Sequence, residues 1–232
     1  MKKRFVSQVE LFKGIKPETL ENILNLGEIV KVPKHSFLIR AKEPVSAIYL
    51  QVSGKSIVYN LTHGGNRKIL FMCGQGSLLN YNLMDDFHSA VFCETIEESE
   101  VFAISVGDFA KCLEKDWKLV QNILFAQEKK IWRLSHQLKN TSSSIQLERK
   151  LAAKLLKLGR DFGIETEEGI EIDVNMSITF LADMLGTSRE TTSRTCTLLT
   201  EAGLIKINKK RITIIDRDKM LEFYKCGNIK ML

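Results

Sequence analysis

The 232-residue sequence lacks the features of several specialised classes of protein. No run approaches the roughly 18 uncharged apolar residues that a membrane-spanning helix requires. The opening residues, MKKRFVSQVELFKG, reach Glu10 and Lys13 before an apolar segment long enough for a signal peptide can form. Neither an internal repeat nor a low-complexity tract is present. We therefore expect a cytoplasmic protein with no membrane partner.

Cysteine and histidine are also too scattered to suggest a metal site. No C-x-x-C pair occurs among the five cysteines, which are Cys73, Cys93, Cys112, Cys196 and Cys226. This spacing favours neither a disulfide framework nor a zinc cage, so we expect reduced thiols. The sequence contains no P-loop and no set of nucleophile, base and orienting residue. We expect no enzyme activity, no metal and no cofactor.

The composition is that of an ordinary globular protein, with 44% apolar and 27% charged residues. The length predicts two domains or one elaborated domain. A net charge of +6 suits a polyanionic partner, but from residue 141 onward 15 Lys and Arg face 13 Asp and Glu. Any interaction with nucleic acid must therefore depend on where individual charges are placed.

The first hundred residues show short apolar runs separated by turn signals about ten residues apart, the pattern of a β-sandwich or barrel. Strands are predicted over residues 48–52, 57–61, 69–73 and 101–104. Gly64 and Gly65 favour a tight hairpin between the second and third of these strands. A short amphipathic helix is predicted over residues 17–26.

A single long helix is predicted over residues 108–140, and residues 141–147 are predicted to form a hinge. Its apolar positions recur at alternating spacings of 4 and 3 residues, as in a coiled-coil seam, beginning with Leu113 and Trp117. We interpret the later part of this helix as the contact between two copies of the chain. The predicted dimerisation residues are Val120, Leu124, Gln127, Ile131, Leu134 and Leu138. The alternative is that this stripe packs on its own domain.

The remaining residues predict a winged helix-turn-helix. A helix ending at Gly159 and an acidic turn over 163–169 precede a short helix from Ile178, a second helix from Arg189, and strands over 204–207 and 211–215. Thr187 and Glu190 have the spacing of a capping box, with Thr187 as the cap of the second helix.

The helix that begins at Arg189 has one face suited to reading base edges. At about 100° per residue, Glu190 and Arg194 lie on the face opposite Thr192 and Cys196. Arginine can donate two hydrogen bonds to guanine, and glutamate can accept one from cytosine. The alternative is an ordinary salt bridge between residues four apart. The preceding helix, the glycine turn and the basic tip of the wing favour contact with DNA.

The sequence as a whole resembles the CRP/FNR family of transcription regulators. Residues 181–194, LADMLGTSRETTSR, are similar to the family's helix-turn-helix, and Gly54, Gly76 and the pair Ser89 and Ala90 match its β-rich half. The resemblance implies an α+β protein with a jelly-roll β-barrel of the cupin-like, cyclic-nucleotide-binding type over residues 1–107. The dimerisation helix at 108–140, the hinge at 141–147 and a DNA-binding domain at 148–232 would follow.

The resemblance also implies a function. A homodimer would bind a palindromic operator in double-stranded DNA under the control of a small-molecule effector, and would contact RNA polymerase if it is an activator. The family patterns R-E-x-x-x-R and E-x-x-S-R imply a half-site of the TGTGA or TTGA kind. The implied DNA contacts are Ser177, Thr179, Ser188, Arg189, Glu190, Ser193, Arg194, Lys209 and Lys210.

The family's cyclic-nucleotide cassette is not retained. Its Gly-Glu pair is replaced by Asn80 and Tyr81, and its Arg-Ser pair by His88 and Ser89. A neutral histidine lacks the fixed charge and the bidentate fork that bind phosphate, so we predict no response to cyclic AMP. The implied effector pocket comprises Leu79, Asn80, Tyr81, Leu83, Met84, His88, Ser89, Ser135 and His136.

Other effectors remain as alternatives. An iron–sulfur cluster of the FNR type is disfavoured because the first cysteine is Cys73, far from the N-terminus. Haem bound by His88 and a redox-active Cys73 or Cys93 are weaker alternatives. An uncharged or aromatic organic effector is favoured, because Tyr81, Leu83, Met84, Phe87 and Phe92 make the region apolar, although the alternative is that these residues belong to the core. A constitutively active regulator and one that binds a glutathione-like ligand are further alternatives. A different class of function is a ligand-binding module that acts through protein partners without DNA.

Overall fold

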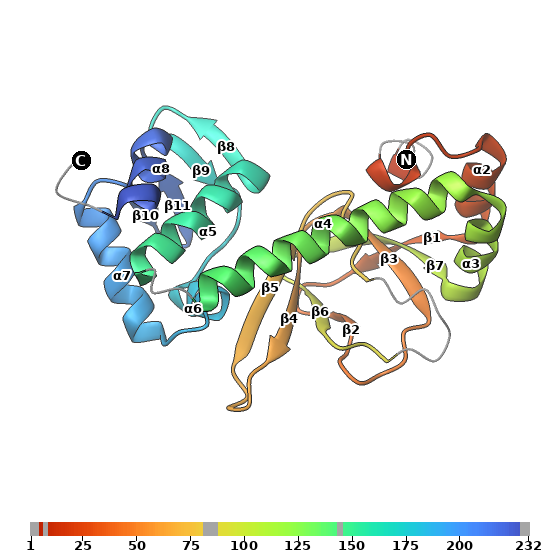
Figure 1. Ribbon diagram of the computed structural model, residues 1–232, viewed down its shortest axis with the longest axis horizontal. Coiled ribbons are helices and arrows are strands. Elements are labelled where there is room, and N and C mark those ends of the chain that lie inside the picture. Colours follow the sequence, from red (N-terminus) through yellow and green to blue (C-terminus); the bar gives the residue numbers. More distant parts are fainter. Residues whose placement is uncertain (1–4, 7–8, 81–87, 143–145, 228–232) are drawn as a thin grey trace. The chain divides into compact units, whose positions relative to one another are not determined.

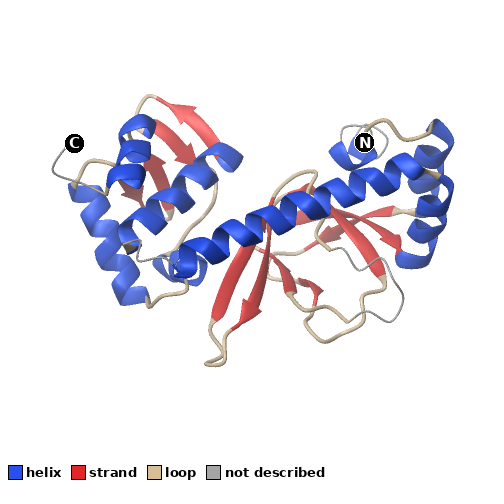
Figure 2. Cartoon of the chain, in the orientation of Figure 1, coloured by secondary structure: helices blue, strands red, loops and turns tan. Residues whose placement is uncertain are grey.

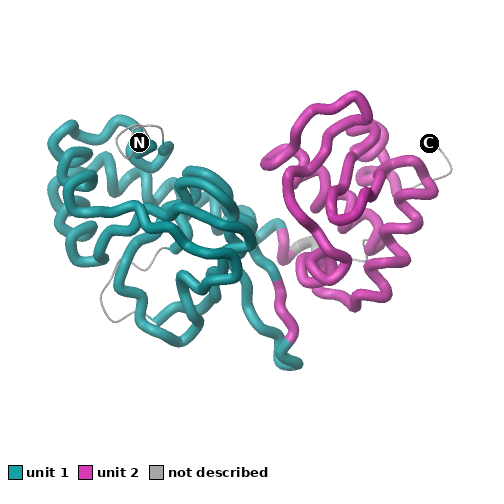
Figure 3. Tube along the Cα trace, turned by 180° about the vertical axis from the view of Figure 1, so that it is seen from behind, with its two compact units in different colours: residues 1–65, 69–136 teal, residues 66–68, 137–232 magenta. Residues whose placement is uncertain are grey.

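The computed structural model describes residues 5–6, 9–80, 88–142 and 146–227 (Figure 1). The chain forms two compact units, residues 1–65 with 69–136 and residues 66–68 with 137–232 (Figure 3). Helices and strands occur in both units, so the predicted α+β class is confirmed (Figure 2). No helix among the described residues is long and apolar enough to cross a membrane.

The elements of the first unit are a 3₁₀ turn, helices and two groups of strands. In chain order they are η1 (Glu10–Phe12), α2 (Pro17–Leu26), β1 (Glu28–Val32), β2 (Phe37–Ile39), β3 (Ala47–Ser53), β4 (Ser56–Leu61), β5 (Arg67–Cys73), β6 (Phe92–Thr95), β7 (Ser99–Ser105), α3 (Val106–Lys115) and α4 (Trp117–Ser142). The predicted helix over residues 17–26 and all four predicted strands are present. Strands β1, β2 and β6 were not predicted.

The described strands form two separate sheets and not the closed barrel that we predicted. One sheet has the order β1-β7-β3 and the other the order β2-β6-β4-β5. The two sheets face each other, because Val101 of β7 lies in one hydrophobic cluster with Val58 and Cys93 of the second sheet. On the other side of the first sheet, Phe102 packs in a cluster with Phe109 of α3. The first sheet is therefore covered on both faces.

The predicted single helix over residues 108–140 is two helices, because the chain is extended at Asp116 (φ −138°, ψ 98°). The Asp116 carboxylate accepts hydrogen bonds from the amides of Lys118, at 2.9 Å, and Leu119, at 3.4 Å, at the start of α4. Its other oxygen accepts from the amide of Lys16, at 2.7 Å. The break at Asp116 involves Lys16, which is a hundred residues away in the sequence. The regular apolar spacing of residues 113–138 therefore does not reveal the break.

The predicted hinge over residues 141–147 is only in part a break. Helix α4 continues through Ser142, and the next helix begins at Leu147. Residues 143–145 lie outside the described residues.

The second unit is a helical layer on a four-stranded sheet. Its elements are α5 (Leu147–Phe162), β8 (Gly163–Thr166), β9 (Gly169–Ile172), α6 (Ile178–Leu185), α7 (Arg189–Glu201), β10 (Ile205–Asn208), β11 (Arg211–Ile214) and α8 (Arg217–Cys226). The sheet has the order β10-β11-β9-β8. Two predictions were wrong: the acidic turn is the β8–β9 hairpin, and α5 does not end at Gly159. A Cβ at Gly159 would lie 2.9 Å from Ile214, so this glycine serves close packing of α5 on the sheet. Helix α8 was not predicted.

The Asp116→Ala variant is expected to lower the free energy of unfolding by about 2 kcal/mol near neutral pH, because three backbone amides lose their shared acceptor. Burial raises the pKa of the Asp116 carboxyl, but its hydrogen bonds outweigh this and hold the pKa below its ordinary value. The stabilisation is therefore present above an ordinary aspartate pKa of about 3.9 and is lost as the pH falls through the lowered value. Urea denaturation followed by circular dichroism, near neutral pH and in acid, measures both effects.

The matched control is Glu114→Ala, at an exposed position of α3. Its change is expected to stay within about 0.5 kcal/mol. Equal losses for the two variants near neutral pH would contradict the role given to Asp116.

Candidate DNA-binding surface and effector sites

Helices α6 and α7 form a helix-turn-helix whose caps are visible in detail. The Ser177 hydroxyl accepts a hydrogen bond from the amide of Phe180 at the start of α6. Gly186 ends α6 in the left-handed conformation, with φ 71°. The second helix begins after Ser188, whose hydroxyl accepts from the amide of Thr191 at 3.1 Å. The turn between the helices is therefore fixed at both ends.

The predicted capping box at Thr187 and Glu190 was wrong. The cap is Ser188, one residue later, and the amide of Thr187 donates to the carbonyl of Ala182 at the end of α6. Two hydroxyl residues, Thr187 and Ser188, are adjacent, and the second of them caps the helix. As a result Glu190 is not needed as a cap.

Helix α7 has the two faces that the sequence predicts. The buried residues are Thr192, Thr195, Cys196 and Leu199. The exposed residues include the predicted base contacts Arg189, Glu190, Ser193 and Arg194. Ser177, Thr179 and Ser188 are exposed as well, at or near the starts of α6 and α7. The packing of the helix therefore uses none of the predicted contacts.

The Glu190 and Arg194 side chains form the salt bridge that the sequence left as an alternative. Arg194 Nη2 donates to Glu190 Oε1, and the two side chains are 77% and 75% exposed. An ion pair this exposed contributes only about 0.3–0.5 kcal/mol. Both groups can therefore turn to another partner at little cost.

The wing is the β10–β11 hairpin. Its two-residue tip is formed by Lys209, in the left-handed conformation with φ 56°, and Lys210, and both are exposed. Met176, just before α6, donates its amide to the carbonyl of Lys210 at 2.7 Å. This bond ties the tip of the wing to the segment that leads into the helix-turn-helix.

Six of the nine predicted effector residues lie within the described part of the chain. Tyr81, Leu83 and Met84 lie outside the described residues. Leu79 and Asn80 are buried. The Asn80 amide is occupied with β3, where it accepts from the amide of Tyr49 and donates to the carbonyl of Ala47, both at 2.9 Å.

The other predicted effector residues form contacts within the first unit or lie on the surface of α4. The buried Ser89 hydroxyl donates to the carbonyl of Val91, and the exposed His88 forms an isolated β-bridge with Pro44. Ser135 and His136 are exposed on α4, where the His136 ring lies 4.0 Å from that of Trp132. The assignment of all nine residues to an effector stays a prediction.

One of the weaker alternatives, a redox-active Cys93, is disfavoured by the burial of its thiol. Burial raises the pKa of Cys93, with a further contribution from Cys73, and burial raises the pKa of Cys196 to about 11. Cys93 and Cys196 are therefore thiols at neutral pH, which disfavours redox chemistry there. No group of three or more metal-binding side chains occurs within the described ranges.

The predicted seam of α4 is open on the single chain. Leu124, Ile131 and Leu138 are 52%, 64% and 71% exposed, and Leu134 is 40% exposed. Val120 and Gln127 are half-buried. The alternative, that this stripe packs on its own domain, does not hold for the four leucine and isoleucine residues. Helix α4 packs on the first unit with a different stripe, which begins with the buried Leu119 and Ile123.

Comparison with protein families covers both halves of the chain. The cyclic nucleotide-binding domain matches residues 29–116, and the Crp-like helix-turn-helix domain matches residues 149–223. The probable transcriptional regulator flp of Lacticaseibacillus casei is 30% identical over 221 residues, which are 93% of this chain and 95% of that protein. The cyclic AMP receptor protein of Thermus thermophilus is 23% identical over 205 residues, 88% and 91% of the two chains.

A solved structure supports the fold. FixK2 from Bradyrhizobium japonicum superposes with a TM-score of 0.74 at 19% identity, covering 84% of this chain and 96% of that one. The fold and the exposed face of α7 define a regulator with a winged helix-turn-helix. The chain belongs to the CRP/FNR family of transcription regulators, as the sequence resemblance implied. It binds DNA through its helix-turn-helix under the control of an effector, and the relatives do not favour a module that acts without DNA.

The Ser188→Ala variant is expected to lower the free energy of unfolding of the second unit by about 1 kcal/mol, the usual loss when a helix cap is removed. Chemical denaturation of the full chain, followed by circular dichroism, measures the change. Ser193→Ala is the control, because Ser193 is exposed within α7 and caps nothing. An equal effect of the two changes would show that Ser188 is not the cap.

Proposed function

We propose that two copies of this chain bind a palindromic operator in double-stranded DNA, with α7 of each copy in the major groove. The observation that carries the proposal is the exposed face of α7, where Arg189, Glu190, Ser193 and Arg194 are free of any packing role. The leading end of a recognition helix is where groove readers place their base contacts. The half-site is of the TGTGA or TTGA kind.

The roles of the individual residues follow from their chemistry. Arg189 and Arg194 donate to guanine, and Glu190 accepts from cytosine. Ser177, Thr179 and Ser188 contact phosphates or base edges, supported by their exposure near the starts of the two helices. Lys209 and Lys210 at the tip of the wing contact the phosphate backbone without selecting a sequence.

The weak salt bridge between Glu190 and Arg194 supports base recognition. In the free protein each neutralises the other across one turn of helix, in full contact with water. Because the pair is weak, DNA with the right bases can replace it by two stronger, less exposed contacts. DNA with the wrong bases would leave one or both charges without a partner, which is the larger penalty.

We further propose that the copies meet along the seam of α4, through Val120, Leu124, Gln127, Ile131, Leu134 and Leu138. Exposed apolar residues at alternating spacings of 3 and 4 bury each other in a two-helix seam. Residues 1–107 form the sensing domain, 108–140 the dimerisation segment, 141–147 the hinge and 148–232 the DNA-binding domain. The protein contacts RNA polymerase when it activates transcription. It is not an enzyme, and its effector is not cyclic AMP.

Base contacts and phosphate contacts are expected to differ in how their loss affects binding. Glu190→Ala and Arg194→Ala should each weaken binding to the preferred site by about 1–3 kcal/mol and relax the choice of base. Lys209→Ala and Lys210→Ala should weaken binding to every duplex alike and reduce the salt slope by about 1. Selection from a random DNA pool, followed by gel-shift titration at several salt concentrations, separates the two effects.

The control is Lys219→Ala, which removes one exposed positive charge from α8 in the same unit. It should leave both affinity and sequence preference unchanged. If the variants of α7 and of the wing behaved alike, the division of roles would be wrong.

The Ile131→Glu variant is expected to convert the dimer to a monomer at micromolar concentration, because a carboxylate cannot be buried in an apolar seam without a partner. Analytical ultracentrifugation measures the change. Phe125→Glu is the matched control, since Phe125 is 53% exposed on α4 and lies one residue off the seam. A dimer that survives Ile131→Glu, or that Phe125→Glu disrupts equally, would place the contact elsewhere.

A further inference from the structure

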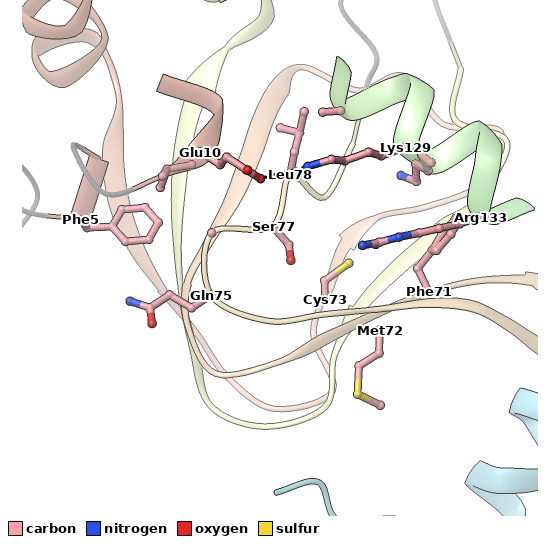
Figure 4. Close-up of a pocket in the computed structure, with 14 residues that line it drawn as sticks. Phe5, Glu10, Phe71, Met72, Cys73, Gln75, Ser77, Leu78, Lys129 and Arg133 are labelled. Carbon is pink, nitrogen blue, oxygen red and sulfur yellow. Dashed lines mark hydrogen bonds and ion pairs between the residues drawn. The ribbon is translucent and has the colours of Figure 1, made fainter. Parts of the chain in front are cut away.

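Burial lowers the pKa of Lys130 and of Lys154, which belong to different units of the chain. Lys130 is one of the residues that line a cavity of about 530 Å³ in the first unit (Figure 4). The thiols of Cys73 and Cys93 oppose the lowering of its pKa. No such opposition is found for Lys154, which lies in α5 of the second unit.

Every cause that acts on Lys154 disfavours its charge. Burial is the largest, Lys68 and Lys157 follow, and together they lower the pKa of Lys154 to about 8. Within the described ranges the Lys154 ammonium forms no hydrogen bond or ion pair that would offset this. About a quarter of such an amine is unprotonated at pH 7.5, against about one in a thousand for a lysine with an ordinary pKa.

Helix α5 and the start of β5 place several lysines together. Lys150, Lys154 and Lys157 follow one another at intervals of 4 and 3 residues, so they lie on one face of α5, where all three are half-buried. Lys68 belongs to the same unit and donates to the carbonyl of Met184 in α6 at 3.4 Å. Lys150 in turn lowers the pKa of Lys68. These four residues form the lysine cluster.

Two acids near the lysine cluster are engaged by other cations. The Asp161 carboxylate forms an ion pair with Lys157. The Asp183 carboxylate in α6 forms one with Arg67, with 3.1 Å between Nη2 and Oδ2. Neither acid is among the causes that act on Lys154. The lysine cluster therefore keeps an excess of positive charge, which attracts anions.

We propose that Lys154 is a site of acylation by small acyl phosphates, of which acetyl phosphate is the simplest. The phosphate of the reagent is attracted by Lys68 and Lys157, and the partly exposed amine of Lys154 attacks the carbonyl carbon. Desolvation and a neighbouring cation activate a lysine as a nucleophile in this way.

The reaction needs no further reactant. The nitrogen of Lys154 forms a bond to the carbonyl carbon, and the bond from that carbon to the phosphate oxygen breaks. The proton that the nitrogen loses is taken up by the departing phosphate. The products are an Nε-acyl lysine and inorganic phosphate. Acylation removes the one charge that burial and two neighbouring cations disfavour.

Mass spectrometry of the full chain, incubated with acetyl phosphate and sampled over time, tests the proposal. The rate at Lys154 is compared with the rate at Lys219, an exposed lysine of α8 in the same unit. A weaker base is also a weaker nucleophile, so the larger share of free amine should make Lys154 about tenfold faster than Lys219. A rate at Lys154 that is equal or lower overturns the proposal.

A neutral reagent separates the attraction of phosphate from the reactivity of the amine. N-hydroxysuccinimidyl acetate delivers the same acetyl group without a phosphate. The ratio of the rates at Lys154 and Lys219 should be about threefold higher with acetyl phosphate, because the lysine cluster attracts only the charged reagent. Added salt should reduce this difference. An equal ratio with the two reagents overturns the proposal.

Variants identify the residues responsible. Lys68→Gln and Lys157→Gln each remove a neighbouring cation and should slow the reaction of Lys154 with acetyl phosphate about threefold. Lys225→Gln, which removes an exposed positive charge from α8, is the matched control and should change nothing. Lys154→Arg should abolish the modified peptide and leave the rate at Lys219 unchanged.

Thermal melts verify that each variant is folded, and two neighbouring variants are used so that one suffices if the other fails to fold. Equal slowing by the control would show a general effect of net charge and overturn the proposal. All of these measurements use the chain without DNA. A protein that binds its operator but shows no selective acylation refutes this site alone, and the converse result refutes the proposed function alone.

Discussion

The buried carboxylate of Asp116 fixes where the longest helix begins and therefore which way each of its faces points. It joins the start of α4 to the amide of Lys16, before α2, through hydrogen bonds from three backbone amides. Leu119 and Ile123, which follow on α4, lie in the core of the first unit. Each later residue of α4 follows at about 100° per residue, so the direction of the exposed seam follows from the burial of Leu119 and Ile123.

Two stripes of residues, one position apart, run along α4. One packs on the first unit, and the other is exposed and is the proposed contact between copies. The stripe through Leu124 and Ile131 is apolar but exposed, whereas the stripe through Leu119 is buried and ends at Lys130 and Arg133. The packing of α4 on the first unit and the proposed contact between copies therefore lie on adjacent faces of one helix, which is the kind of shared element that allosteric control uses.

Local signals predicted much of the fold, and distant contacts account for most of the errors. The helix over residues 17–26 and the strand around Ile48 follow from periodicity alone. The break at Asp116 does not, because its partner is a hundred residues away. Strand β1 is half exposed along its length and so lacks a clean alternation, and β2 has only three residues. The glycine at 159 looks like a helix end but is a packing contact with Ile214.

The sequence predicts the exposed face of α7 more directly than it predicts the residues that bind an effector. The exposed face of α7 follows from helix geometry, since the buried Thr192 and Cys196 fix the positions of Glu190 and Arg194. The predicted effector residues came from a resemblance to a cassette that this sequence has lost. One of these residues, Asn80, forms hydrogen bonds with the backbone of β3, which the resemblance gave no reason to expect. The change from apolar to basic residues along one face of α4 is present in the sequence. It can be recognised only once the buried residues of that face are known. A regular apolar spacing identifies one face of a helix. The role of the adjacent face can be judged only when it is known which of its own residues are buried.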